Sequence, residues 1–208
     1  MPKIIGGSLG AHREEMRKRI FAAFDDLLAS HGYADLTLAE IAAAAGLGRT
    51  AMYNYHPDKE SLLLAFTDHE TEIYLADLGS RLADVTNPIE QLMVYIRAEM
   101  EKLAGQHVSP SSLTGLLSDV GRNRMREHVM PLWQVLLEIL NSAVEEDYLP
   151  DGNTMTKLHL VSASTSGRWS KDLAGEQLDE AIREVTAFVL RGLGVQLDLS
   201  GSPLRLSR

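Results

Sequence analysis

Apolar side chains recur every three or four residues along most of this chain, and this spacing constrains its fold more than any other feature. In the first long segment they are Met16, Ile20, Phe24, Leu27 and Leu28. Such a stripe is typical of an amphipathic α-helix, and a second stripe runs through residues 178–193. No segment alternates apolar and polar residues over six positions with β-branched enrichment, as a half-buried strand would. The pattern predicts an all-α fold.

Capping residues, glycines and prolines divide the chain into about nine expected helices. Their ranges are 11–30, 38–45, 49–55, 59–85, 88–105, 110–121, 122–148, 154–173 and 177–193. Pro131 falls inside the seventh range, and we expect it to kink or break that helix because proline lacks an N–H donor. The tail from residue 196 is expected to be loose.

The segment from Thr37 to Tyr55 has the spacing of a helix-turn-helix. Thr37-Leu38-Ala39-Glu40 is a capping box, in which the threonine hydroxyl and the glutamate carboxylate each bond an unpaired backbone amide. The small residues that follow allow close packing of a second helix, and Gly46 supplies the turn because glycine tolerates positive φ. We therefore expect residues 49–55 to read DNA.

The side chains on and around this second helix suit a nucleic-acid contact. Arg49 can pair with guanine and Thr50 with a base edge, whereas tyrosine, histidine and lysine side chains suit phosphates. On helix 11–30, Arg13 and Arg17 have no acidic residue at i,i+4 spacing and are further phosphate candidates. The basic face of this helix could equally be a solvated surface, because Glu14–Lys18 and Glu15–Arg19 have the spacing of i,i+4 ion pairs. The candidate DNA-binding residues are Thr37, Gly48, Arg49, Thr50, Tyr53, Asn54, Tyr55, His56, Lys59, Arg13 and Arg17.

This stretch resembles the TetR family of bacterial one-component transcriptional regulators. The resemblance is carried by Thr37-x-x-x-Ile41-Ala42-x-x-Ala45-Gly46 and by Tyr53-x-Tyr55-x-Pro57-x-Lys59-Glu60-x-Leu62. Ala22-x3-Asp26-Leu27-x4-Gly32 also matches. The resemblance implies a helix-turn-helix DNA-binding domain in residues 1–58 and a ligand-binding and dimerisation domain in residues 59–208. It also implies a homodimer on a pseudo-palindromic DNA operator.

Three positions depart from the family pattern. Gly48 stands where a serine is common, Ala51 where a phosphate-binding hydroxyl is common, and His56 where a phenylalanine is common. The reader helix therefore lacks a side-chain cap at its start. Because of these departures, the sequence is also compatible with an alternative function, a helical protein-interaction adaptor that has lost DNA binding.

Methionine and tryptophan are frequent in the C-terminal part, which suits an adaptable apolar pocket, and the resemblance implies that a small-molecule effector binds there. Plain core packing is the alternative for any one of these residues. The candidate ligand-binding residues are Phe66, His69, Met93, Ile96, Met100, Leu117, Met125, Val129, Trp133, His159 and Trp169. The scattered histidines have no i,i+3 or i,i+4 spacing, so we expect no metal site.

The last two helices are the expected dimer faces. Small residues in helix 154–173 allow close approach of another helix, and the wide stripe of helix 177–193 can pack on its own domain and on a partner. Both helices could instead serve only the intrachain bundle. The candidate dimer residues are Ser162, Ser166, Ile182, Val185, Phe188 and Val189.

Charge and composition limit the remaining choices. The chain has a net charge of −9 and no cysteine, which excludes disulfides and thiolate chemistry. Residues 1–60 hold 7 basic and 8 acidic side chains, so DNA binding must rely on a few placed cations. With no run of about 18 apolar residues and no signal-peptide pattern, we expect a cytoplasmic protein without a membrane partner.

We therefore predict a ligand-responsive DNA-binding transcriptional regulator, specifically a repressor released from its operator by a small, largely apolar effector. We expect no cofactor and no enzymatic activity, because no nucleophile, base and orienting group are found together. The adaptor, and an enzyme on the same fold, remain the alternatives.

Overall fold

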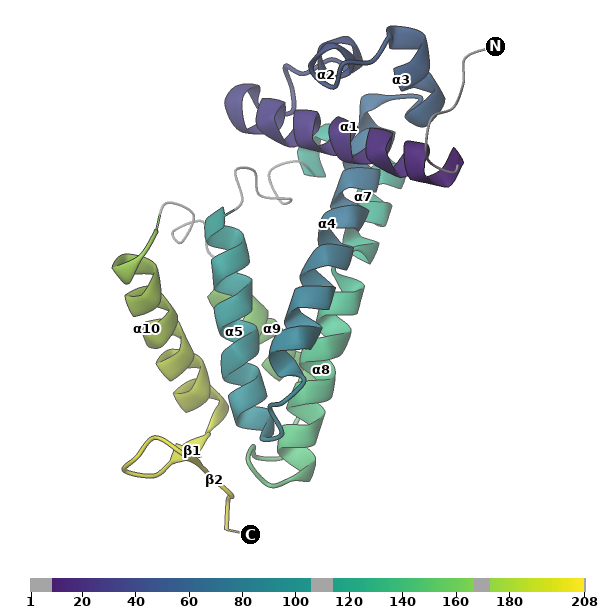
Figure 1. The fold of residues 1–208 in the computed structure, drawn as a ribbon. Helices are drawn as coiled ribbons and strands as arrows, with labels where there is room; N and C mark the ends of the chain where they lie inside the picture. Colours follow the sequence, from purple (N-terminus) through teal and green to yellow (C-terminus); the bar gives the residue numbers. More distant parts are fainter. Residues whose placement is uncertain (1–8, 106–113, 167–172, 208) are drawn as a thin grey trace. The chain divides into compact units, whose positions relative to one another are not determined.

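The predicted all-α fold class is confirmed by the computed structural model, which describes residues 9–105, 114–166 and 173–207 (Figure 1). Helices form nearly all of its regular structure, and the exception is a pair of two-residue strands. Over the described residues, no helix is both long enough and apolar enough to cross a membrane. The chain divides into two compact units, Met1–His69 with His107–Met125, and Glu70–Gln106 with Arg126–Arg208.

The first unit is built around a helix-turn-helix. It contains α1 (Leu9–His31), α2 (Leu38–Ala44), α3 (Arg49–Tyr55), the start of α4 (Lys59–Leu82), η1 (Thr114–Leu116) and most of α7 (Asp119–Glu127). Its core includes the fully buried side chains of Ile20, Phe24, Ile41, Met52 and Leu62. These positions are the apolar stripes of four different helices, so burial of the stripes holds the helices together.

The turn between α2 and α3 is stabilised by main-chain and side-chain contacts. Gly46 has a φ of +68°, which favours glycine, and the Leu47 N–H donates to the carbonyl of Ala42 at 2.8 Å. The Arg19 guanidinium donates to the carbonyl of Ala45 at 2.6 Å. A charged side chain from α1 therefore pairs the main chain at the end of α2 and anchors the turn.

The second unit is a helical bundle. It contains the rest of α4, together with α5 (Pro88–Gly105), α8 (Met130–Glu145), α9 (Thr154–Thr165) and α10 (Glu176–Leu193). The helix α5 packs against α8, α9 and α10, and its Leu92 and Ile96 are fully buried beside Leu136 and Leu140 of α8. Because α5 is buried on most of its circumference, it forms the centre of this unit.

Several predicted helix boundaries were wrong. The break expected at Pro131 is confirmed, because range 122–148 is divided between α7 and α8 and Pro131 lies in the first turn of α8, where its missing N–H costs nothing. Range 110–121 contains η1 and the start of α7, and residues 110–113 lie outside the described chain. The helix expected over 154–173 is described as α9 to Thr165, and residues 167–172 are outside the description.

The tail that we expected to be loose is a small antiparallel hairpin of β1 (Gln196–Leu197) and β2 (Pro203–Leu204). The Asp198 carboxylate closes its turn by accepting the amides of Ser200 and Ser202 at 2.8 and 2.9 Å. The Leu206 N–H then donates to the Asp147 carbonyl at 2.7 Å. Local turn chemistry thus orders a segment with little apolar content.

The two compact units do not share the bounds of the proposed functional domains, 1–58 and 59–208. The first turns of α4 place Leu62 and Leu63 in the first core. The segment 114–125 adds Leu117 and Met125 to the same core. Residues on both sides of position 59 therefore stabilise the helix-turn-helix.

The start of α7 is held by an acidic side chain of α4. The Glu60 carboxylate accepts bonds from the Ser118 amide at 2.8 Å and from the Ser118 hydroxyl at 2.5 Å. A negative charge at a helix N-terminus is favourable because of the helix dipole. Gly121 lies against this carboxylate, and a Cβ there would overlap the Glu60 oxygens.

We predict that Gly121→Ala displaces the Glu60 carboxylate and that Gly79→Ala does not, because no atom lies within 4 Å of a Cβ added at Gly79. Both changes gain the helix propensity of alanine, but only the first loses charged hydrogen bonds. Gly121→Ala should therefore be about 1–3 kcal/mol less stable than Gly79→Ala in urea unfolding. Equal stabilities of the two variants would contradict the role given to Glu60.

Candidate DNA-reading surface and effector sites

The surface of α3 presents a row of polar side chains. Gly48 is the N-cap with no side-chain cap bond, as expected, and Met52 is fully buried. Arg49, Thr50, Tyr53 and Asn54 are exposed, and Tyr53 is 49% accessible. With Met52 fixed in the core, these four side chains share the opposite face of one short helix, available to a groove of DNA.

Thr37 belongs to the support of this helix pair. Its hydroxyl accepts the Glu40 amide at 3.3 Å, and the Glu40 carboxylate accepts the Thr37 amide at 2.9 Å, which completes the predicted capping box. The bonds from Thr37 lower the pKa of Glu40. The Thr37 hydroxyl therefore fixes the start of α2, and a role in contacting DNA would be additional to this one.

Lys59 has a structural role that the sequence did not reveal. Its ammonium donates to the carbonyls of Tyr33, Leu36 and Ala34 at 2.7, 2.8 and 3.1 Å. It also lies 4.5 Å from the centre of the Tyr33 ring. All three N–H bonds of the ammonium thus have acceptors, so we no longer assign this group to a phosphate. Lys59 instead ties the start of α4 to the loop after α1.

Tyr55 and His56 are half-buried at the end of α3. The His56 N–H donates to the Met52 carbonyl at 2.9 Å, and its ring lies 6.3 Å from that of Phe21. Burial lowers the pKa of His56, although Asp58 opposes this shift. A lowered pKa disfavours the charged form of the imidazole.

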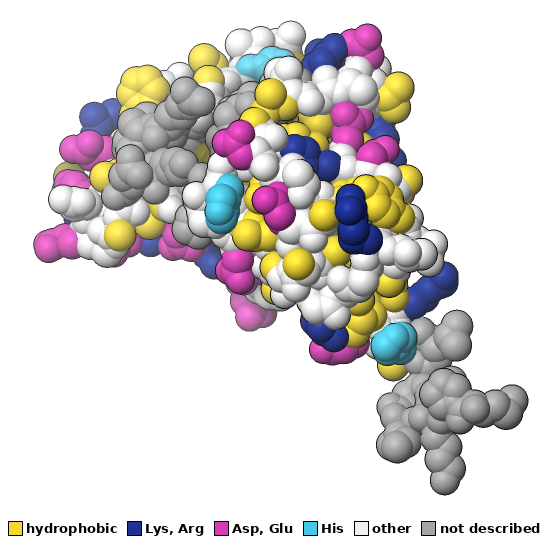
Figure 2. All heavy atoms as spheres, turned by 90° about the horizontal axis from the view of Figure 1, so that it is seen from above, with side chains coloured by type: hydrophobic (Ala, Val, Ile, Leu, Met, Phe, Trp, Pro, Cys, Tyr) yellow, Lys and Arg dark blue, Asp and Glu magenta, His cyan; other side chains and the backbone are white. Residues whose placement is uncertain are grey.

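The basic residues of α1 differ in their exposure and in their partners. Arg13 is exposed, whereas Arg17 pairs with Glu14 at 3.0 Å, an i,i+3 contact that the sequence argument overlooked. The hydrogen bond from Arg17 lowers the pKa of Glu14. On the face drawn in Figure 2, the described basic side chains lie apart from one another among acidic and apolar ones. A broad basic field is therefore not seen on the described part of this face.

The candidate ligand-binding residues divide between the two units. Phe66, His69, Leu117 and Met125 belong to the first unit, where the Phe66 ring meets Phe21 and Phe24 edge-on at 5.7 and 5.3 Å. The others that are described belong to the second unit: Met93, Ile96, Met100, Val129, Trp133 and His159. Trp169 lies outside the described residues. The residues from the first unit belong to a packed core. Apolar residue types in a sequence are equally compatible with a core and with a pocket, so the sequence could not distinguish the two.

Two of the grooves within the second unit lie between neighbouring helices. The α8–α9 groove has a volume of about 590 Å³ and is mainly apolar, lined by Met130, Pro131, Trp133, Leu137, Met155 and Leu158 among others. Trp133 is the predicted pocket residue found there, and its ring meets His159 edge-on at 5.4 Å. The α4–α5 groove has a volume of about 500 Å³ and is lined by five charged residues, with Tyr74 and Ala98 in its wall.

A buried polar cluster next to the α4–α5 groove was missed by the sequence argument. Tyr74 and Tyr95 are almost fully buried, and the charge of Glu99 adds to burial in raising the pKa of both hydroxyls. Burial also raises the pKa of Glu99. A sequence signal existed, because Glu99 follows Leu92 and Tyr95 on the apolar face of α5, where a carboxylate is out of place.

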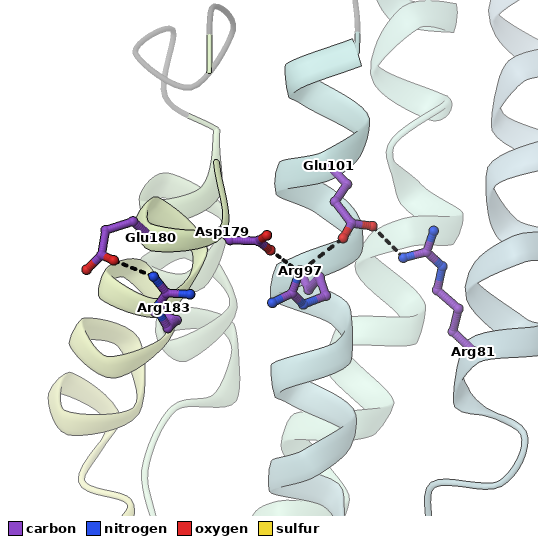
Figure 3. Close-up of polar contacts among 6 residues, drawn as sticks. All are labelled: Arg81, Arg97, Glu101, Asp179, Glu180 and Arg183. Carbon is purple, nitrogen blue, oxygen red and sulfur yellow. Dashed lines mark hydrogen bonds and ion pairs between the residues drawn. The ribbon is translucent and has the colours of Figure 1, made fainter. Parts of the chain in front are cut away.

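Ion pairs connect three helices of the second unit (Figure 3). Glu101 of α5 accepts Arg81 of α4 at 2.6 Å and Arg97 of α5 at 3.3 Å. Arg97 also pairs with Asp179 of α10 at 2.9 Å. These side chains are one-third to one-half exposed, so each pair adds at most about 1 kcal/mol. The network orients α4, α5 and α10 more than it stabilises them.

The candidate dimer residues of α10 face two directions. Ile182, Val185 and Val189 are buried in the core of their own chain, so their stripe is used by contacts of α10 with α5 and α9. Phe188 is 68% exposed on the outer face of α10, beside Glu184 and Arg191. On α9, Ser162 is half-buried and Ser166 exposed. The buried part of the stripe thus serves the core of its own chain, and Phe188 is the candidate dimer residue of α10 that remains exposed.

Comparison with known proteins agrees with the helix-turn-helix. Residues 20–66 match the model of the bacterial regulatory proteins, tetR family, which confirms the resemblance seen in the sequence. An uncharacterized HTH-type transcriptional regulator of Mycobacterium tuberculosis is 35% identical over 89 residues. That match spans 42% of this chain and 44% of the relative, less than half of either length.

Solved structures share the fold over most of the chain. The transcriptional regulator FadR from Bacillus subtilis, in complex with stearoyl-CoA, has a TM-score of 0.73 at 17% identity, over 84% of this chain and 98% of that one. AibR, in complex with isovaleryl coenzyme A and operator DNA, has a TM-score of 0.67 at 16% identity, over 83% and 97%. At these identities the likeness establishes the fold alone.

We predict that Lys59→Met destabilises the first unit by about 1–2 kcal/mol, because the loop carbonyls lose a charged donor. Lys18→Met removes the same charge from an exposed position on α1 and should change the free energy of unfolding by less than about 0.5 kcal/mol. Urea unfolding monitored by circular dichroism measures both. If the two variants are equally stable, Lys59 does not hold the loop.

Proposed function

We propose that this chain, whose residues 20–66 match the N-terminal model of the TetR family, is a ligand-responsive DNA-binding transcriptional regulator. We propose further that it is a repressor, released from a pseudo-palindromic operator by a small, largely apolar effector. The observation that carries the proposal is the exposed row of α3 on a capped helix-turn-helix.

In this proposal α3 enters the major groove. Arg49 pairs with a guanine edge and Thr50 with a neighbouring base, while Tyr53 and Asn54 contact bases or phosphates. The backbone N–H groups in the first turn of α3 have no side-chain cap at Gly48 and can donate hydrogen bonds to a phosphate oxygen. Tyr55 and His56 are secondary candidates because both are half-buried.

Charge determines how DNA is held. Residues 61–208 hold 13 basic and 21 acidic side chains, so this part of the chain repels phosphate. In this proposal Arg49 supplies a specific base contact and Arg13 a phosphate contact, and Arg17 reaches a phosphate only if it leaves Glu14. We expect weak non-specific binding that falls with added salt.

The effector is proposed to bind in the second unit. Two proteins that share this fold are described as complexes with stearoyl-CoA and with isovaleryl coenzyme A, which supports an effector site on such a bundle. An effector changes DNA binding by preferring one conformation of the protein over another. The helix α4 belongs to both units, so a shift of α4 can carry this preference to the reader helix.

A homodimer is proposed through the last two helices, α9 and α10. The outer face of α10, with exposed Phe188, is available to a second copy, and Ser162 and Ser166 allow close approach of α9. A two-fold dimer sets two reader helices about 34–36 Å apart, in successive major grooves. The opposite side of α10 is held in the core of its own chain by Ile182, Val185 and Val189.

Two alternatives are ranked below the regulator. An adaptor without DNA binding is favoured only by the missing hydroxyls at Gly48 and Ala51. An enzyme has no assembled set of catalytic groups among the residues we singled out, and the matched family is one of regulators. A DNA-binding role also places the protein in the cytoplasm, with no cofactor required.

Arg49→Ala should weaken binding to the duplex flanking the protein's own gene by about 1–3 kcal/mol, and should relax specificity at one base position. Arg205→Ala removes the same charge from the C-terminal tail and should leave binding unchanged. Fluorescence anisotropy at fixed salt measures both affinities. Equal affinities of Arg49→Ala and the wild type would remove Arg49 from the reading surface.

Phe188→Ala should weaken the dimer by about 2–4 kcal/mol, because each dimer buries two copies of this ring at its centre. Leu199→Ala shortens an apolar side chain at the hairpin turn that is more exposed than Phe188, and it should leave association unchanged. Sedimentation equilibrium gives the dissociation constants. Unchanged association of Phe188→Ala would place the dimer interface elsewhere.

A further inference from the structure

The α4–α5 groove has a buried aromatic wall. Tyr74 lines the groove although only 8% of its surface is exposed, and Ala98 beside it is 2% exposed. Both residues lie in the second unit, as do all the others that line this groove. A volume of about 500 Å³ is enough for a small organic molecule.

A cation already occupies the face of Tyr74. The Lys102 ammonium lies 4.1 Å from the centre of the Tyr74 ring, within the range of a cation–π contact. The long flexible stem of lysine allows this ammonium to leave the ring for solvent at low cost. The Tyr74 face is therefore a surface for cations, and it is occupied by a group that can be displaced.

A carboxylate lies beside the Tyr74 hydroxyl. Glu99 lies on the apolar face of α5, close enough to Tyr74 for the two groups to interact electrostatically. The Tyr74 hydroxyl and the Glu99 carboxylate are close enough to interact through a hydrogen bond. Among the described residues, however, Tyr74 Oη and Glu99 Oε1 have no partner that meets strict hydrogen-bond geometry. Both atoms are buried, so this pairing is weaker than a closely packed structural cluster would provide.

The charges around the groove favour a positive ligand. Its acidic lining residues are Glu70, Asp77 and Glu101, and its basic ones are Arg81 and Lys102. Arg81 is committed to Asp77 at 2.7 Å and to Glu101 at 2.6 Å. With Glu99 added, acidic groups exceed basic ones by two, which disfavours a carboxylate or phosphate ligand.

We propose that the α4–α5 groove binds a small organic cation, a protonated amine on an apolar body, as the effector of this regulator. The ligand ammonium takes the place of the Lys102 ammonium on the Tyr74 ring, where the charge of Glu99 attracts it as it attracts Lys102. The apolar body lies along Ile73 and Ala98. The regulatory role of this ligand rests on the proposed function. Binding of the amine itself does not, because it does not require DNA.

This binding mode predicts an order of affinity among ligands of similar shape and different charge. Phenethylamine carries the cation, 2-phenylethanol is neutral, and 3-phenylpropanoate is an anion on a similar body. Only the amine can satisfy both the aromatic face and the carboxylate. Titration of the full-length protein, followed by ligand-observed NMR, should give phenethylamine a dissociation constant about tenfold or more below those of the other two.

Two variants and one control assign this preference to the groove. Glu99→Gln keeps the shape of the side chain and should abolish the advantage of the amine. Glu90→Gln removes an exposed carboxylate from the same helix and should preserve it. Lys102→Met removes the competing ammonium and should tighten amine binding, a gain that a structural lysine would not produce. Thermal unfolding checks that each variant is folded.

The proposal is overturned if the wild type binds all three ligands equally, or prefers the anion. It is also overturned if Glu99→Gln retains the preference or if Lys102→Met weakens amine binding. Operator binding, measured separately by anisotropy, distinguishes this failure from failure of the regulator assignment. If the protein prefers the amine but does not bind DNA, the proposed amine site stands and the proposed role as a regulator fails.

Discussion

A single helix must satisfy two hydrophobic cores, and the rest of the structure depends on this constraint. Near its start, α4 buries Leu62 and Leu63 in the core of the helix-turn-helix, and near its end it buries Leu78 in the bundle. A continuous hydrogen-bonded helix transmits rotation and translation along its length. The helix α4 contributes buried side chains to both cores.

Within the first unit, the charged and polar groups fall into two sets with different uses. Thr37, Arg19 and Lys59 pair with the main chain or with a capping carboxylate, and they fix the loop and the turn that position α3. Arg49, Thr50 and Asn54 are exposed on the face opposite Met52. The side chains that position α3 and the exposed side chains of α3 are of the same polar and basic types. Only their bonding partners in the structure distinguish the two sets. This separation makes the reading surface small and well defined.

Local rules predicted much of the fold, because spacing, caps and breakers act within a few residues. The capping box at Thr37, the turn at Gly46 and the break at Pro131 all depend on neighbours in sequence. Contacts between distant residues could not be predicted in this way. The three carbonyls around Lys59 lie more than twenty residues away, and the burial of Val185 depends on packing against other helices. Glu99 could have been found, since it interrupts an apolar stripe.

The central claim is that two copies of α3 read one symmetric DNA site. Selection of binding sites from random duplexes by the purified protein tests it most directly. The account predicts enrichment of an inverted repeat whose half-sites are centred about 10 base pairs apart, or a multiple of this spacing. Enrichment of an asymmetric single site would contradict the two-fold arrangement. No enrichment at low salt would contradict the reading role of α3 itself.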